Sequence, residues 1–419
     1  MRLFTPNHPP QLGRLTRTVA LLICAGPLGA TTVVAQTDPG ITRQAALLAQ
    51  REAKRDTLVP ERVSQAEERV RAFETLRLPR AIFVKGFNGL RPVLGGLPGG
   101  SGFAFGGGYI NGLNRRAYEF TTNARYSTLG YRQADINLVF PNERSTSPVS
   151  AGLRAEYRDF TELNYFGLGT GSSVDDRAFY RIEDRTVGAD VSVNSTIFDA
   201  GATVGLWNGR IDSGSRLPSV EDEFDPSNTP GFEMQPDFLR YGAPATVTLL
   251  DGGLPPVGLT VRLDAERYDD REGGAFDFTR IAAELRAQVP LGLRNRVLAF
   301  RMRTSHATAD AGAEVPFYLM ETIGGAQSLR GYREYRFRDA RNLLMNLEYW
   351  WEVWTYLDFA VFADAGKVFS AADDFGFDDL HTGYGFGIRT HSPNNTVFRI
   401  DLSRSREGFV LHIGGGPTF

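Results

Sequence analysis

The sequence predicts an all-β protein: a 16-stranded antiparallel transmembrane β-barrel preceded by a short N-terminal helical segment. Three observations predict this fold. Apolar and polar residues alternate through most of the 419-residue chain, the alternating segments have the length of tilted bilayer crossings, and long connections alternate with short ones. After the first 35 residues, no segment has the 18 or more uninterrupted apolar residues that a spanning helix needs.

The alternation is clearest toward the C-terminal end. Between residues 342 and 353, one face of the expected strand is apolar: Leu343, Met345, Leu347, Tyr349, Trp351 and Val353. The opposite face is mainly polar: Asn342, Asn346, Glu348 and Glu352. A strand with lipid on one side and a polar interior on the other has this period of two.

The connections also favour a membrane barrel over a soluble sandwich. We expect strands to begin near residues 82, 101, 117, 131, 149, 179, 197, 237, 257, 275, 294, 341, 355, 382, 395 and 408. Long connections follow strands 5, 7, 11 and 13, at 160–177, 212–237, 306–340 and 369–381, whereas the connections after even strands are short. Outer-membrane barrels have this asymmetry, and an even count places both barrel ends at the side of the short turns.

Residues 1–35 are expected to form a cleavable export signal. They contain a basic region, Arg14–Arg17, an apolar stretch that begins at Val19, and a small residue, Ala35, at the expected cleavage site. Processing before Cys24 as a lipoprotein is the less favoured alternative, because bulky Ile23 precedes the cysteine. The signal implies a bacterial envelope protein, and the strand pattern places it in the outer membrane, in contact with outer-membrane lipids.

The composition of the mature chain excludes several classes of function. The 43 basic and 49 acidic residues after the signal give a net charge of −6, which argues against nucleic-acid binding by net positive charge. Cys24 is the single cysteine of the whole chain and lies in the signal, so the mature chain has neither a disulfide nor a cysteine-ligated metal site. We expect no cofactor and no metal.

Residues 36–80 form a separate segment before the barrel, which is expected at 81–419. Pro60 stands near a helix start, and apolar residues follow with helical spacing: Val63, Ala66, Val70, Phe73 and Leu76. The segment is interpreted either as a periplasmic tether or as a plug of the barrel lumen. The sequence does not separate these two alternatives.

Four motifs in the second half of the chain occur in order. They are GGAQSLRGY at 324–332, RFRDARNLLMNLEYWWEV at 336–353, LDFAVFADAGKVF at 357–369 and GYGFGIR at 383–389. Together they resemble the BamA/TamA superfamily of outer-membrane assembly and translocation barrels, also called bacterial surface antigens, which includes the two-partner secretion transporters. The resemblance is dense over 323–419 and thinner over 86–304, where NYFGLGTGSS at 164–173 resembles the loop after strand 5.

The resemblance implies that the long connection after strand 11 folds into the lumen as a lid loop. The arginine of its tip, Leu329-Arg330-Gly331-Tyr332, is then expected to meet Asp364 of the motif formed by Phe362, Asp364 and Gly366. The alternation independently places Asp364 on the inward face of its strand. The alternative is that Arg330 pairs with another lumenal acid, such as Glu348. Family members usually carry POTRA domains before the barrel, and residues 36–80 do not match one.

Two further sets of residues are candidates on the last strands. Gly383, Gly385 and Gly387 share an inward face and leave room for a loop or another backbone to approach. The last strand carries an apolar row that includes Phe409, Leu411, Ile413 and Phe419, and its terminal aromatic residue resembles the recognition signal of bacterial outer-membrane barrels. Gly415 and Pro417 depart from that signal.

The favoured function is insertion of other barrels into the outer membrane or export of polypeptide across it, with unfolded outer-membrane or secreted polypeptides as clients. A weak seam between the first and last strands would open toward lipid. The alternatives are a passive or gated diffusion channel and a structural or adhesive surface barrel. We expect a monomeric barrel that is not an enzyme, since the four mature histidines form no evident serine–histidine pair on the lipid-facing wall: His306, His381, His391 and His412.

Overall fold

The computed structural model describes residues 87–111, 117–141, 147–252, 257–292, 296–354, 357–391 and 396–419. The expected export signal and the segment 36–80 lie outside these residues. None of the helices in the described ranges is long and apolar enough to cross a bilayer.

Sixteen strands form one continuous sheet. They are β1 (Leu90–Leu94), β2 (Ala104–Asn111), β3 (Glu119–Ser127), β4 (Arg132–Phe140), β5 (Val149–Tyr165), β6 (Ala178–Asn194), β7 (Phe198–Ser213), β8 (Phe238–Gly252), β9 (Val257–Asp270), β10 (Phe278–Pro290), β11 (Arg296–Ala309), β14 (Arg341–Trp354), β15 (Leu357–Phe369), β16 (His381–His391), β17 (Thr396–Ser405) and β18 (Gly408–Gly414). A separate pair consists of β12 (Glu321–Ile323) and β13 (Phe337–Asp339). The helices of the described residues are short: α4 (Val220–Glu223), η3 (Pro226–Asn228), η4 (Phe317–Leu319) and η5 (Ala372–Asp374).

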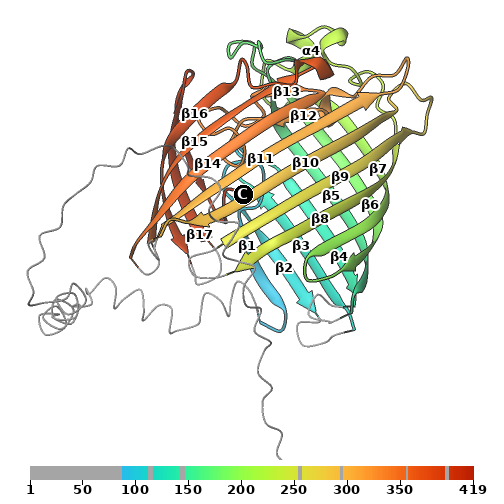
Figure 1. Cartoon of the computed structure of the whole chain (residues 1–419). Coiled ribbons are helices and arrows are strands. Elements are labelled where there is room, and N and C mark those ends of the chain that lie inside the picture. The colour runs from blue at the N-terminus through green and yellow to red at the C-terminus, as the bar shows by residue number, and fades with distance from the viewer. Residues whose placement is uncertain are drawn as a thin grey trace, which may run out of the picture. The chain divides into compact units, whose positions relative to one another are not determined.

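The sheet confirms the predicted fold class. Each strand is antiparallel to its neighbours in chain order, β11 pairs directly with β14, and the sheet curls into a barrel (Figure 1). The first strand is the least well predicted, since β1 begins at Leu90 and residue 82 lies outside the described part. Within the described residues, no ladder joins β1 to β18.

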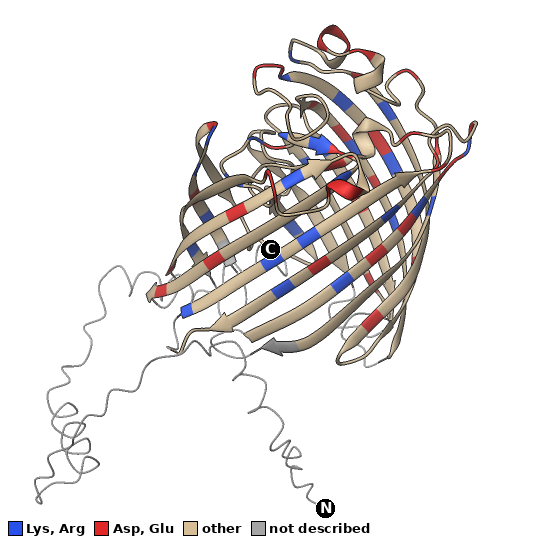
Figure 2. Ribbon diagram, turned by 45° about the horizontal axis from the view of Figure 1, so that its top comes forward, with Lys and Arg blue, Asp and Glu red and all other residues tan. Residues whose placement is uncertain are grey.

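The two faces of the strands differ as the alternation predicts. On β15, Phe359 and Val361 are 40% and 55% exposed on the outer face, while Phe362 and Asp364 on the inner face are 5% and 2% exposed. Large apolar side chains are exposed in the same way along many strands, including Leu153, Val187, Val204, Leu263, Ile281, Leu347, Phe386 and Leu411. Figure 2 shows that charged residues recur along the strands and in the loops at the end where α4 lies. The outer wall is therefore suited to lipid.

The long connections gather at one end of the barrel, which we call the loop end, and build an apolar core there (Figure 1). Aromatic side chains near the loop end of several strands, such as Tyr165, Trp207 and Phe238, are buried together. They pack with Phe317 and Tyr318 from the connection between β11 and β14. Trp207 stacks on Tyr318 with ring centroids 5.7 Å apart. This end of the lumen is filled by side chains.

The C-terminal end of the chain departs from the predicted pattern. Phe409, Leu411 and Ile413 are 67%, 58% and 63% exposed on the outer face, as expected. Phe419 is not on that face: β18 ends at Gly414, and the Phe419 ring lies 5.1 Å from the guanidinium carbon of inward-facing Arg301. The expectation for Phe419 is therefore wrong. Three consecutive glycines provide no side chains to pack, and Pro417 lacks a ladder donor, so the chain leaves the sheet and turns inward.

Substitution of Leu263 by arginine tests the assignment of the outer wall. Leu263 is 53% exposed at the middle of β9. We expect Leu263→Arg to lower the free energy of unfolding in lipid by about 2–4 kcal/mol, because the charge must enter the bilayer. Urea unfolding in liposomes measures the change. The control Leu263→Met keeps the site apolar and should stay close to wild type; equal stability of the two variants would contradict a lipid-facing wall.

Candidate functional site

The connection between β11 and β14, residues 310–340, folds into the barrel and is called the lid loop below. Its β12–β13 pair brings two apolar tip residues, Leu329 and Tyr332, to full burial at 0% and 1% exposure. They pack with Ile323, Phe337, Leu344 and Val368, the last two from the inner wall of β14 and β15. Gly331 has a φ of +95°, a conformation that suits glycine, and makes the tight turn at the tip.

Arg330 lies at the centre of the site and is fully buried. Its Nε and Nη2 atoms each donate to Asp364 at 2.7 Å, and its backbone N–H donates to the same carboxylate at 3.1 Å. The guanidinium carbon lies 3.5 Å from the centre of the Phe362 ring. The predicted lid residue and the predicted strand residues are therefore in direct contact, through a bidentate ion pair that is stacked on an aromatic face.

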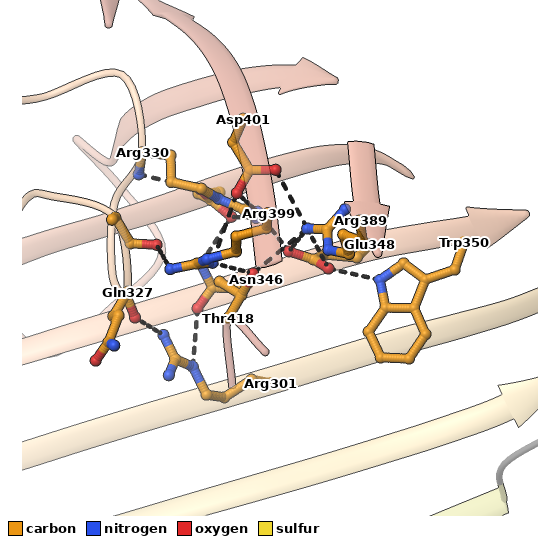
Figure 3. Close-up of polar contacts among 12 residues, drawn as sticks. Arg301, Gln327, Arg330, Asn346, Glu348, Trp350, Arg389, Arg399, Asp401 and Thr418 are labelled. Atoms are coloured by element: carbon orange, nitrogen blue, oxygen red, sulfur yellow. Dashed lines mark hydrogen bonds and ion pairs between the residues drawn. The ribbon is translucent and has the colours of Figure 1, made fainter. Parts of the chain in front are cut away.

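Glu348, the alternative partner that the sequence suggested, also contacts Arg330. Arg330 Nη1 donates to Glu348, which in turn accepts from Arg389 Nη2 at 3.0 Å and from Trp350 Nε1 at 2.6 Å. Asn346 donates to Asp364 at 2.7 Å and to the carbonyl oxygen of Ser328 at 2.7 Å. Figure 3 shows Arg330, Glu348 and Arg389 pointing toward one another, with Trp350 beside Glu348. Arg330 thus pairs with two acids, and Arg389 supplies the second positive charge.

The three inward glycines of β16 leave space for three different groups. A Cβ atom at Gly383 would lie 1.8 Å from the carbonyl oxygen of Arg330, and one at Gly385 would lie 2.7 Å from the Phe362 ring. A Cβ atom at Gly387 would lie 1.9 Å from Oδ1 of Asp401. Gly366 has a similar role, because its missing side chain would meet Ile323 of the lid loop. The glycine row allows the lid tip and the acids to fit against the wall.

Two further arginines lie opposite each other on β16 and β17. Arg389 and Arg399 are cross-strand partners of like charge, a destabilising arrangement unless acids lie between them. Asp401 lies 3.5 Å from each and 3.8 Å from Arg330. The buried cluster, which we call the lid charge cluster, contains four arginines and three acids: Arg301, Arg330, Arg389, Arg399, Glu348, Asp364 and Asp401. It carries one more positive than negative charge.

The stem of the lid loop is held at the loop end by the connection after β5, residues 166–177. Arg336 donates to the carbonyl oxygen of Ser172 at 2.7 Å and to Glu407 at 2.8 Å. The backbone N–H of Gly169 donates to the carbonyl oxygen of Arg338 at 2.8 Å, and Arg338 donates to that of Phe317 at 2.6 Å. The segment 164–173, whose sequence resembles the family's loop after strand 5, therefore contacts the lid loop.

One acidic group of the lid loop has an unusual pKa. Burial raises the pKa of the Glu334 carboxyl to about 7, although a backbone hydrogen bond from Ala326 and the charge of nearby Arg399 oppose this shift. The backbone carbonyl of Glu334 accepts a hydrogen bond of 3.0 Å from Asn164 of β5. The carboxyl is therefore partly protonated near neutral pH.

Sequence reasoning identified Arg330, Asp364, Glu348 and the glycine row as parts of the site. It placed Asn346 on a polar strand face but gave it no partner, and it did not assign Arg301, Arg389, Arg399, Asp401 and Thr418 to the site. Alternation reveals which side chains point inward. It does not reveal which strands bring them to one level, because that depends on the register and tilt of the sheet.

Comparisons with known proteins agree with this fold. A family model described as the Omp85 superfamily domain matches residues 113–405. Among solved structures, BamA from Haemophilus ducreyi lacking POTRA domains 1–3 is similar with a TM-score of 0.57 and 14% identity, over 79% of this chain and 69% of that chain. CdiB from Escherichia coli is similar with a TM-score of 0.53 and 11% identity, over 78% of this chain and 60% of that chain. No curated protein sequence matches the chain.

Loss of either partner of the central ion pair should destabilise the barrel. Arg330→Ala leaves Asp364 and Glu348 buried without their main cation, and Asp364→Ala leaves Arg330 short of its bidentate acceptor. We expect each variant to lower the free energy of unfolding by about 3–5 kcal/mol, measured by urea unfolding in liposomes. The control Arg262→Ala breaks a more exposed pair with Asp264 on the same strand and should cost about 1 kcal/mol or less.

The charge swap Arg330→Asp with Asp364→Arg should fail to restore stability. The new aspartate at position 330 would replace the contacts of Arg330 with Glu348 and Asp401 by like-charge repulsion, and those two acids would keep only Arg389 and Arg399 as partners. Full recovery by the swap, or single variants within about 1 kcal/mol of wild type, would show that the pair does not anchor the lid loop.

Proposed function

This chain belongs to the Omp85 superfamily, and we propose that it inserts polypeptides into the outer membrane or exports them across it. It is an outer-membrane β-barrel with an apolar outer wall and a lumen that contains its own lid loop. The observation that carries the proposal is the lid charge cluster. A barrel that only admitted small solutes would not need a bidentate, fully buried anchor for a segment that fills its lumen.

The two end strands of the sheet, β1 and β18, meet at a seam. β1 and β18 are among the shortest strands of the sheet, at five and seven residues, and no ladder joins them within the described residues. The chain after β18 turns inward instead of extending the edge. We propose that this seam opens toward lipid and gives a client segment an edge with which to pair.

Depletion of the protein in its own host tests the proposal. We expect a defined subset of outer-membrane or secreted proteins to fall in abundance, because those polypeptides depend on this barrel. Quantitative proteomics of the outer-membrane and secreted fractions measures the loss. Complementation should use the wild-type chain and variants with one cysteine in β1 and one in β18, selected by a crosslinking scan. The mature chain has no cysteine of its own.

The crosslinked variants separate the mechanisms. A seam that must open predicts that the oxidised variant fails to restore the clients, whereas the same variant kept reduced restores them. Full activity of the oxidised variant would exclude opening at the seam. An unchanged proteome combined with reduced uptake of small solutes would favour a diffusion channel instead.

A further inference from the structure

The chain after β18 binds inside the lumen, beside the lid loop. Residues 415–419, which we call the tail, place Thr418 at 4% exposure and bring its hydroxyl to two arginines. The hydroxyl accepts a hydrogen bond of 3.4 Å from Arg389 Nη2 and a shorter one from Arg399 Nη1. The Phe419 ring lies 5.1 Å from the guanidinium carbon of Arg301. Figure 3 shows Thr418 beneath Arg399, with Arg301 close by.

The arginines that bind the tail are also fixed by groups outside the tail. Arg301 donates to Asn346 at 3.0 Å and to the carbonyl oxygen of Gln327 in the lid loop at 2.6 Å. Arg399 donates to the carbonyl oxygen of Ala326 in the lid loop at 3.0 Å. All three arginines are at most 6% exposed. Lid and wall therefore hold this face, which we call the arginine face, by hydrogen bonds that do not involve the tail.

The arginine face has a hydrogen-bond donor that the tail does not use. Arg389 Nη1 has no hydrogen-bond partner among the described residues although it is buried. The lid charge cluster around it carries one excess positive charge. Guanidinium groups recognise hydroxyl, carbonyl and carboxylate oxygens, and they stack on aromatic rings. These features suit an extended peptide in which a hydroxyl or acidic side chain precedes an aromatic one.

The tail makes these contacts without ladder pairing, since β18 ends at Gly414. Its described interactions with the arginine face come from one hydroxyl and one ring, which other polypeptides also carry. We propose that the arginine face is a peptide-binding site, which the tail occupies while the lid is closed and which a polypeptide in transit occupies in its place. This inference rests on the proposed function, because it names the site at which a client competes with the tail.

Binding of a labelled peptide tests this site directly. The probe is the hexapeptide Gly-Gly-Gly-Pro-Thr-Phe with a fluorophore at its N-terminus, and the readout is fluorescence anisotropy with the full chain in lipid nanodiscs. A variant that lacks residues 415–419 should bind the probe at least tenfold more tightly than wild type, in which the tethered tail competes at high effective concentration. Adding Arg301→Gln to the deletion should weaken binding at least tenfold.

Two controls make the result specific. Arg262→Gln, an inward substitution on β9 with its partner Asp264 on the same strand, should leave probe binding to the deletion variant unchanged. A probe that ends in alanine instead of phenylalanine should lose binding. If the deletion variant does not fold, the double variant Thr418→Ala and Phe419→Ala keeps the chain length and replaces it.

The proposal is overturned if the folded variants do not bind the probe, or if binding survives both Arg301→Gln and the loss of the aromatic ring. Wild type that binds as tightly as the deletion would likewise contradict occupation by the tail. Such results would remove the peptide site alone, because the proposed function is tested separately by the proteome after depletion.

Discussion

A guanidinium held inside a barrel is the constraint on which the rest of this structure depends. Arg330 is fully buried, and an unpaired charge there would be very costly, so the wall must supply acids at a fixed level and orientation. Asp364 and Glu348 meet that demand from two neighbouring strands. Buried ion pairs contribute little net stability compared with apolar packing, but they strongly restrict geometry. The cluster therefore positions the lid loop more than it strengthens the barrel.

Other features of the wall follow from the same constraint. The glycines of β16 leave room for the lid backbone, the Phe362 ring and Asp401, and each larger side chain there would displace one of them. The aromatic core at the loop end buries the stem of the lid loop, so the tip is held by charge and the stem by apolar packing. The tail adds a third segment to the same set of arginines. Lid loop, last strand and wall are thereby physically linked.

The sequence predicted the strands far better than it predicted the site. Strict alternation reports the two environments of every strand, and sixteen strands with alternating loop lengths leave little choice of fold. The lid contact was predicted from a family resemblance that named Arg330 and Asp364. The roles of Asp401 and Asn346 were not predicted because they arise from register across β14–β18, which alternation does not encode, and that of Thr418 was not predicted because the tail leaves the sheet before it. Phe419 was placed wrongly because its apolar side chain matched the row of Phe409, although the glycines before it end the strand.

Single-channel conductance in planar bilayers tests most directly whether the buried cluster holds the lid in the lumen. The account predicts that the wild-type barrel stays almost closed and that Arg330→Gln shows frequent openings of large conductance, because the tip is no longer anchored. A matched Arg262→Gln barrel should remain as closed as wild type, because Arg262 pairs with Asp264 on its own strand. A wild-type barrel that conducts continuously, or an Arg330→Gln barrel that conducts no more than wild type, would contradict the claim.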